Sequence, residues 1–406
     1  WTAHEGECGQ SFRDVVSNMT LKASYSLTAD RGPASVSNSK AIINSYNTWR
    51  PFTSVKESGL TLSSVENSEL TYEKKHELNI GAEIGFIDNR INIEADWYTR
   101  NNFDLIGLIY TKGTGGQLAK FANVASMKSS GVEFTVSTRN IKTKDFSWNT
   151  DFIFSHTKNE VTDLQSNASV MDMISGNGFA MEGYPVRALF SMDFQGLNEN
   201  GYPTFINEKG QLTVSDINFQ EQLKKDHLVY EGPTDPTMTG SLGNIFRYKG
   251  FTLNAFITYS FGNVIRLDPV FHNVYSDLDA MPREFINRWT TGGDENVTNV
   301  PVIADKRANQ QDPYLSYAYN AYNYSTERIA KGDFIRMKEL SLSYNFPKKM
   351  ISRLKVNDLS LKIQATNLFL IYSDKKLNGQ DPEFFNTGGV ASPVPRQFTL
   401  TLRLGI

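Results

Sequence analysis

Five tyrosines lie close together in one segment of this 406-residue chain. They are Tyr314, Tyr317, Tyr319, Tyr322 and Tyr324. A tyrosine side chain offers a flat apolar ring and a hydroxyl group, which suits the binding of a sugar ring or a peptide side chain. The same predicted long loop also carries Phe271, His272, Tyr275, Asp277 and Asp279. We expect substrate contact from this group, with packing of the loop or contact with a partner protein as the alternative.

The rest of the sequence offers no catalytic constellation. Asp226 and His227 place an acid beside a base, but adjacent side chains of a strand point apart, and a loop pair would be solvated. The glycine-rich segment 113–116 lacks the Lys-Ser or Lys-Thr of a phosphate-binding loop. We therefore predict no catalytic residues and no enzyme activity.

Metal ligands are also sparse in the sequence. Asp277 and Asp279 could offer oxygens to a calcium ion, but no glycine or distal glutamate completes a binding loop. The five histidines are scattered without a zinc-binding motif, and Cys8 is the only cysteine. The sequence predicts no metal site and no cofactor.

The alternation of side chains predicts the elements that carry these loops. From Arg396 to Ile406, every second residue is apolar and the residues between are polar or glycine. The apolar positions are Phe398, Leu400, Leu402, Leu404 and Ile406. Successive side chains of a strand point to opposite faces, so the pattern predicts a two-faced strand. A membrane β-barrel needs such strands, with one face toward lipid and the other toward a wet interior.

The same alternation recurs in eleven segments, beginning with 19–29. Charged residues occupy the middle of their polar faces: Glu83, Glu94, Asp96, Asp151, Glu339, Lys362 and Arg403. A small packed barrel would exclude these charges, whereas a wide barrel with a hydrated lumen accepts them. The sequence therefore predicts an all-β, antiparallel transmembrane barrel. A large soluble antiparallel sheet with one exposed face is the alternative that periodicity leaves open.

Composition narrows the class of protein further. The net charge is -3 and no basic block occurs, so nucleic acid is not an expected partner. The mean hydropathy is -0.39, and the longest apolar run is too short for a membrane-spanning helix. Barrel strands of about ten residues give only weak hydropathy signals. Aromatic residues make up 12% of the chain, many at strand ends, as expected for aromatic girdles at a membrane interface.

The predicted connections alternate between short and long. Short turns are expected at 88–89, 140–144, 249–250 and 347–355. Long connections are expected at 101–120, 158–183, 263–331 and 373–395. Outer-membrane barrels have short periplasmic turns and long external loops. This parity predicts extracellular long loops and a periplasmic C-terminus.

Several short sequence segments carry more information than the alternation of polar and apolar residues. Residues 332–344 read Gly-Asp-Phe-Ile-Arg-Met-Lys-Glu-Leu-Ser-Leu-Ser-Tyr, and 365–369 read Ala-Thr-Asn-Leu-Phe. Asp-Pro-Glu follows at 381–383 and Pro-Arg at 395–396. Earlier segments of the same kind are 123–133, 183–186, 235–236 and 243–251. In this order they resemble the SusC/RagA-type TonB-dependent transporters of Bacteroidetes, from about residue 73 to the end.

The resemblance implies a 22-stranded, plugged outer-membrane barrel that imports oligosaccharides or peptides. It also implies a SusD-type surface lipoprotein as a lid, energy coupling through the TonB complex, and a dimer of transporter–lid pairs. Nothing in the chain resembles the plug, the TonB box or the early strands. We therefore expect residues 1–406 to be the C-terminal part of a single barrel domain embedded in outer-membrane lipid. Ile406 departs from the family's usual aromatic terminus.

Two other functions remain open at this stage. A TonB-dependent siderophore receptor would share the barrel but would need no surface lipoprotein. A soluble β-rich binding or adhesion protein would use the strands without a membrane.

Overall fold

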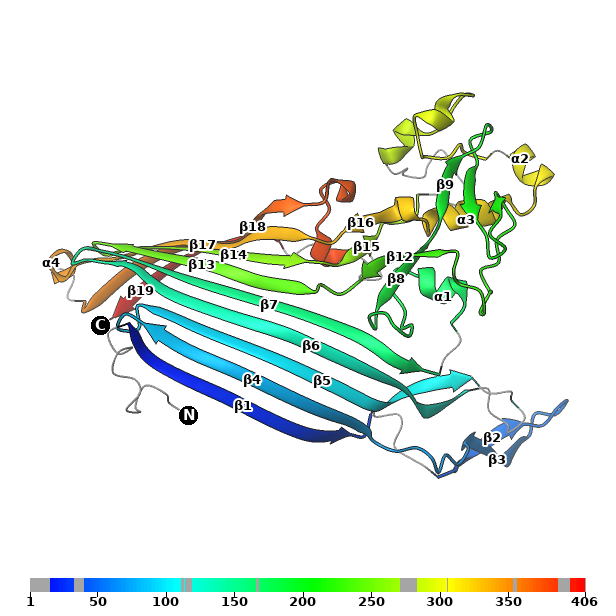
Figure 1. Cartoon of the computed structure of the whole chain (residues 1–406), viewed down its shortest axis with the longest axis horizontal. Coiled ribbons are helices and arrows are strands. Elements are labelled where there is room, and N and C mark those ends of the chain that lie inside the picture. The colour runs from blue at the N-terminus through cyan, green and yellow to red at the C-terminus, as the bar shows by residue number, and fades with distance from the viewer. Residues whose placement is uncertain are drawn as a thin grey trace.

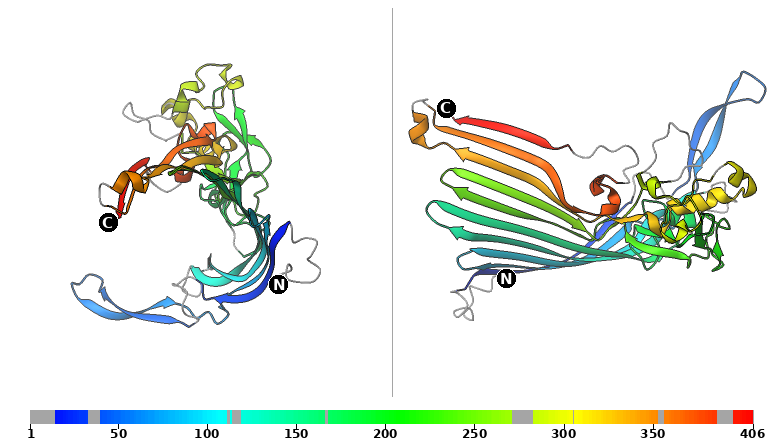
Figure 2. Two further views of the ribbon diagram at one scale, coloured as in Figure 1. Left: turned by 90° about the vertical axis from the view of Figure 1, so that its left-hand side faces the viewer. Right: turned by 90° about the horizontal axis from the view of Figure 1, so that it is seen from above.

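A ten-stranded antiparallel sheet dominates the computed structural model, which describes residues 15–32, 40–110, 113, 119–165, 168–270, 283–304, 306–352, 356–385 and 395–405. The strand order is β1-β4-β5-β6-β7-β13-β14-β17-β18-β19, and Figure 2 shows the sheet curving as an open arc. Its strands are β1 (Val16–Asp30), β4 (Glu73–Phe86), β5 (Ile91–Tyr110), β6 (Ala119–Lys142), β7 (Phe146–Leu164), β13 (Met238–Tyr248), β14 (Phe251–Phe261), β17 (Phe334–Asn345), β18 (Asp358–Ser373) and β19 (Gln397–Gly405). The predicted antiparallel all-β fold is confirmed, with ten strands in this sheet against eleven predicted segments.

The strand register sorts side chains onto two faces of the sheet. One row of direct partners across four strands is apolar throughout: Leu253, Leu342, Ile363 and Leu400. The other face carries charges, and there Lys22 lies 3.2 Å from Glu83 and 3.3 Å from Glu94. Because successive strand residues alternate in direction, each strand contributes to both faces.

Short turns join the strands at one end of the sheet. β13 and β14 are joined by Lys249 and Gly250, whose φ values of 43° and 91° match a tight hairpin turn. Asp88 and Asn89 also have positive φ, at 52° and 55°, a conformation that these two residue types tolerate. The short helix α4 (Lys348–Ile351) lies between β17 and β18. These turns, and the C-terminal end of β19, lie together at the left of Figure 1.

All the long connections leave the opposite end of the sheet, as the alternation of turn lengths predicts (Figures 1 and 2). One of them forms the hairpin of β2 (Ile42–Trp49) and β3 (Lys56–Ser64), which extends beyond the sheet. Two predicted loops are shorter than expected. β5 continues to Tyr110 and β7 continues to Leu164, because their pairing with β6 persists through register shifts.

The connections β7–β13 and β14–β17 fold together into what we call the loop unit, the described residues of 165–237 and 262–333. Its strands are β8 (Ala188–Met192), β9 (Phe194–Leu197), β10 (Pro203–Ile206), β11 (Leu212–Thr213), β12 (Leu228–Pro233), β15 (Val264–Arg266) and β16 (Ile329–Lys331). Its helices are α1 (Val170–Ile174), α2 (Lys306–Gln311) and α3 (Leu315–Asn323), with 3-10 turns η3 (Arg283–Asn287), η4 (Asp294–Asn296) and η5 (Thr326–Arg328). The last long connection contains η7 (Lys375–Leu377) and η8 (Pro382–Phe384).

The main hydrophobic core lies in the loop unit rather than in the sheet. Phe205, Met192 and Ile174 are fully buried there together with Leu315 and Tyr319 of α3. The apolar residues of the sheet are largely exposed, with Leu400 at 69%. The two parts of the chain therefore gain stability differently: the loop unit by packing, and the sheet by its hydrogen-bonded ladders.

Both edge strands of the main sheet have one partner within the described residues. β1 pairs only with β4, and β19 pairs only with β18. The arc is therefore open between these two strands. Among the described residues, no helix is both long enough and apolar enough to cross a membrane.

Candidate binding site

The tyrosine cluster of the sequence forms helix α3 and its two flanking residues, rather than an irregular loop. Tyr319 and Tyr322 are 1% and 2% exposed and belong to the core of the loop unit. The hydroxyl of Tyr319 donates to the backbone oxygen of Val302 at 2.7 Å. Burial raises the pKa of Tyr322 above its usual range. These two rings hold the helix in place.

Tyr314 and Tyr317 face outward from the same helix. They are 61% and 43% exposed, and their rings stack with centroids 5.9 Å apart. Phe219 meets the Tyr317 ring edge-on at 6.1 Å. An exposed aromatic pair held by a neighbouring ring is a rigid apolar surface with hydroxyl groups at its margin. The other predicted binding residues, Phe271, His272, Tyr275, Asp277 and Asp279, lie outside the described residues.

Tyr324 closes the cluster against a buried cation. The guanidinium of Arg266 lies 5.9 Å from the Tyr324 ring centroid. Arg266 is 4% exposed, and it donates to the backbone oxygens of Phe190 at 2.6 Å and Ser325 at 2.8 Å. Burial lowers the pKa of Arg266 to about 10. Arg266 thereby ties β15 to β8 and to the end of α3, and it fixes the base on which the tyrosine helix stands.

The charge of Glu231 acts on this cation. Its carboxyl is largely buried, and desolvation raises its pKa despite a hydrogen bond with Ser191 and the charge of Arg266. Oε1 of Glu231 has no hydrogen-bond partner among the described residues. Ionisation of a desolvated carboxyl lowers the stability of the folded state, so the stability of the fold depends on pH.

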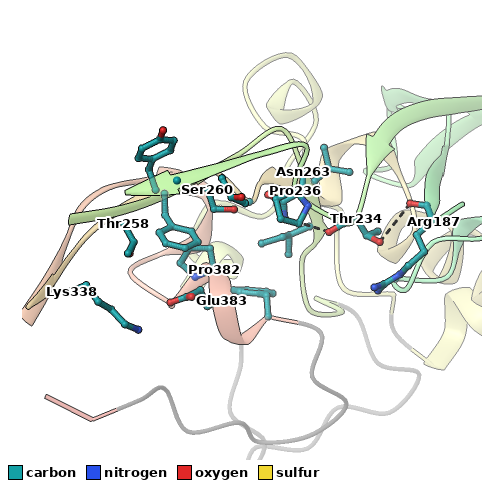
Figure 3. Close-up of a pocket in the computed structure, with 18 residues that line it drawn as sticks. Arg187, Thr234, Pro236, Thr258, Ser260, Asn263, Lys338, Pro382 and Glu383 are labelled. Atoms are coloured by element: carbon teal, nitrogen blue, oxygen red, sulfur yellow. Dashed lines mark hydrogen bonds between the residues drawn. The ribbon is translucent and has the colours of Figure 1, made fainter. Parts of the chain in front are cut away.

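A cavity of about 580 Å³ opens where the loop unit meets the sheet (Figure 3). Its floor is made by β13, β14 and β17, through Thr239, Thr258, Ser260 and Phe334, and η8 covers it with Pro382 and Glu383. In Figure 3, Lys338 lies at one end of the labelled residues and Arg187 at the other. Arg187 is paired with Asp235 at 2.7 Å. The cavity is thus lined by hydroxyl groups between two cations.

A buried ion pair holds η8 over the cavity. The guanidinium of Arg336 contacts the carboxylate of Asp381 and lies 2.8 Å from that of Glu383. The side chains of Arg336 and Asp381 are 5% and 11% exposed. Asp381 also caps η8 by accepting from the backbone of Glu383 at 3.1 Å. The sequence did not predict this ion pair. Its two segments, 332–344 and 381–383, stood out only because their sequences resemble those of a known family.

The described residues contain no group of three or more histidine, cysteine or acidic side chains arranged to hold a metal ion.

Known proteins resemble the chain over most of its length. It is 24% identical over 362 residues to the TonB-dependent receptor P3 of Formosa agariphila, covering 84% of this chain and 34% of that protein. It is 25% identical over 357 residues to the TonB-dependent receptor SusC of Bacteroides thetaiotaomicron, covering 84% and 32%. The chain spans between 32% and 40% of the length of these and two further receptors. No protein-family model matches it.

Solved structures agree on the fold. The RagAB peptide transporter superposes with a TM-score of 0.76 at 21% identity, covering all of this chain and 42% of that one. Its 'open-open' state gives a TM-score of 0.77 at 20% identity. The predicted resemblance to SusC/RagA-type TonB-dependent transporters is confirmed, and the fold is that of part of their barrel. The proteins matched are named as receptors and transporters rather than enzymes.

Proposed function

We propose that this chain forms part of the wall of an outer-membrane transporter that imports oligosaccharides or peptides with energy supplied through TonB. The observation that carries the proposal is the similarity to SusC and to the RagAB structure over nearly the whole chain. Under this proposal the chain is the C-terminal part of one barrel domain, and a plug and earlier strands are supplied by the rest of a longer protein.

The two faces of the sheet support a position in a membrane. The row Leu253, Leu342, Ile363 and Leu400 would face lipid, and the charged face would line a hydrated lumen. Near the short turns, Trp148 stacks on Phe246 at 5.5 Å. Such rings suit the boundary between hydrocarbon and water.

The open edges support completion of the wall by further strands. Backbone N–H and C=O groups cannot face lipid without partners, since each unpaired group costs several kcal/mol there. In the described residues β1 and β19 each leave one edge unpaired. Earlier strands of the same barrel would fill the gap between them.

The position of the long connections supports an external binding chamber. With the short turns and the C-terminus in the periplasm, the loop unit stands outside the cell. There Tyr314 and Tyr317 would contact substrate directly or a SusD-type surface lipoprotein acting as a lid. A pair of such transporter–lid units is the assembly we propose.

The test starts from outer membranes containing the full-length protein with a tag in an external loop. After solubilisation in detergent, capture on the tag and intact-mass measurement should recover one much longer polypeptide together with a surface lipoprotein. Uptake of labelled oligosaccharide and peptide mixtures by cells should require TonB. Recovery of the transporter without a lipoprotein, together with uptake of iron chelates, would instead support a siderophore receptor.

A soluble chain released without detergent would contradict the proposal altogether. It would also restore the alternative of a soluble β-rich binding or adhesion protein.

A further inference from the structure

One lysine in the cavity, Lys338, has no counter-charge in the part of the chain that the structure describes. Lys338 makes no ion pair and no hydrogen bond with any described residue, whereas its neighbour Arg336 is held by Asp381 and Glu383. The other cation of the cavity, Arg187, is paired with Asp235. Each acidic group near the cavity therefore already has a partner, and Lys338 carries the unmatched positive charge.

An irregularity of β17 places Lys338 and the next residue, Glu339, on the same side of the sheet. The pairing of β17 shifts by one residue at Lys338 against β14, and it shifts again against β18 between Met337 and Glu339. A residue left over at such a β-bulge changes the direction of the side chains around it. Glu339 faces the polar side of the sheet, where it lies 3.7 Å from Lys362, and Lys338 lines the cavity on that same side. Regular alternation would have placed these consecutive residues on opposite faces.

Free hydrogen-bonding groups lie beside the lysine. The hydroxyls of Thr239, Thr258 and Ser260 make no hydrogen bond to any described residue, and all three line the cavity floor. Oδ1 of Asn263 is a buried acceptor that no described residue contacts by a hydrogen bond. A carboxylate can accept from an ammonium and hydroxyl groups together, and such charge-assisted hydrogen bonds are stronger than neutral ones. A neighbouring N–H on the same ligand could donate to Asn263.

We propose that the cavity binds the free carboxylate of a short peptide, with Lys338 as its counter-ion and the three hydroxyl groups as further donors. This inference rests on the proposed import function and specifies one substrate class. A peptide fits better than a neutral sugar because its terminal carboxylate supplies the negative charge that Lys338 lacks among the described residues. The peptide's backbone N–H groups would meet the unpaired acceptor of Asn263.

The experiment uses the intact transporter, immobilised in detergent. Two mixed-sequence octapeptide pools are applied, one with free C-termini and one with amidated C-termini, and retained peptide is measured by mass spectrometry. We expect the wild type to retain the free-acid pool at least tenfold more than the amidated pool. Lys338→Gln should abolish this preference, and Lys338→Arg should restore most of it. Lys362→Gln, on the same polar face but outside the cavity, should retain peptides as the wild type does.

Several results would overturn the inference. Equal retention of both pools by the wild type would do so without any variant, even if Lys338→Gln failed to assemble. A Lys338→Gln protein with unchanged preference would reject the lysine while leaving peptide import intact. Retention of oligogalacturonate, but of neither peptide pool, would place the carboxylate on a sugar instead. Retention of nothing, in cells that also fail to import peptides or glycans, would count against the proposed function itself.

Discussion

Arg336 and Asp381 form a buried ion pair across 45 residues of sequence. This contact holds the connection between β18 and β19 against the N-terminal end of β17. Glu383 supplies a second carboxylate, so the guanidinium bridges two acids two residues apart. Arg336 comes from strand β17, whereas Asp381 is the N-cap of a single 3-10 turn. The ion pair therefore joins the hydrogen-bonded main sheet to the connection that contains η8, which has few hydrogen bonds of its own.

Arg336→Met should loosen this connection. Removing one partner of a buried ion pair leaves the other charge uncompensated and typically costs about 3–5 kcal/mol. We expect faster proteolysis within 374–385 while the barrel still assembles, measured by limited digestion of the purified transporter. Arg336→Met combined with Asp381→Leu should recover part of the loss, because no unpaired charge then remains between these two positions. Equal digestion of wild type and Arg336→Met would contradict the role assigned to the pair.

The tyrosines of α3 should separate into two classes. Tyr319→Ala removes a buried ring and should cost about 3–5 kcal/mol of unfolding free energy, by analogy with other buried aromatic truncations. Tyr319→Phe removes only the hydrogen bond to Val302 and should cost about 1 kcal/mol. Tyr314→Ala and Tyr317→Ala are exposed changes and should stay within about 0.5 kcal/mol of wild type. Thermal unfolding of the loop unit followed by tyrosine fluorescence measures all four.

The effects of these tyrosine variants on uptake should follow the opposite order to their effects on stability. If Tyr314 and Tyr317 contact substrate or lid, the double alanine variant should lower uptake severalfold without loss of assembled barrel. Normal uptake by that variant would show that neither Tyr314 nor Tyr317 is needed for contact with substrate or lid. Deleting the helix is a poorer test, since Tyr319 and Tyr322 are part of the core.

The two faces of β19 should respond differently to charge. Leu400→Arg would place a cation on the apolar row, at a cost of about 2–4 kcal/mol if that position lies near the middle of the bilayer. Thr399→Arg, one residue away, would place the same cation on the polar face beside Gln364. We expect Leu400→Arg to reduce the folded fraction seen in unheated gel electrophoresis and Thr399→Arg to leave it unchanged. Similar behaviour of the two variants would argue against a lipid-facing row.

Glu231 should make the loop unit less stable as the pH rises. Burial raises the pKa of Glu231 above its unfolded value, so the folded state binds the proton more tightly than the unfolded state does. The resulting stability is present below the unfolded pKa, about 4.3 for a glutamate, and is lost as the pH rises through the folded pKa.

Glu231→Gln removes this dependence with little change of shape. The variant should melt higher than wild type at pH 7, and the gap should close by about pH 4. Melting curves of the detergent-solubilised protein at both pH values check this. A variant less stable than wild type at pH 7 would mean that the attraction between Glu231 and Arg266 outweighs desolvation.

Local chemistry in the sequence accounts for most of the sheet. Alternation along the chain placed Leu400 and Thr399 on opposite faces, because side-chain direction in a strand is a local property with a period of two. Turn chemistry was also local, as the positive φ values at Asn89 and Gly250 illustrate. β5 and β7 continue beyond their predicted ends because they remain paired with β6. That pairing depends on residues distant in sequence.

The sequence by itself determined the strand faces and the alternation of short and long connections, and it predicted an aromatic segment as a binding site. Only the tertiary structure decided that Tyr319 and Tyr322 are buried while Tyr314 and Tyr317 are exposed, because helix α3 packs one side against strands more than 100 residues earlier in the chain. Only the tertiary structure brought Arg336 to Asp381 and left Lys338 without an ion-pair partner among the described residues. Charge pairing depends on distances in space, and a sequence records only distances along the chain.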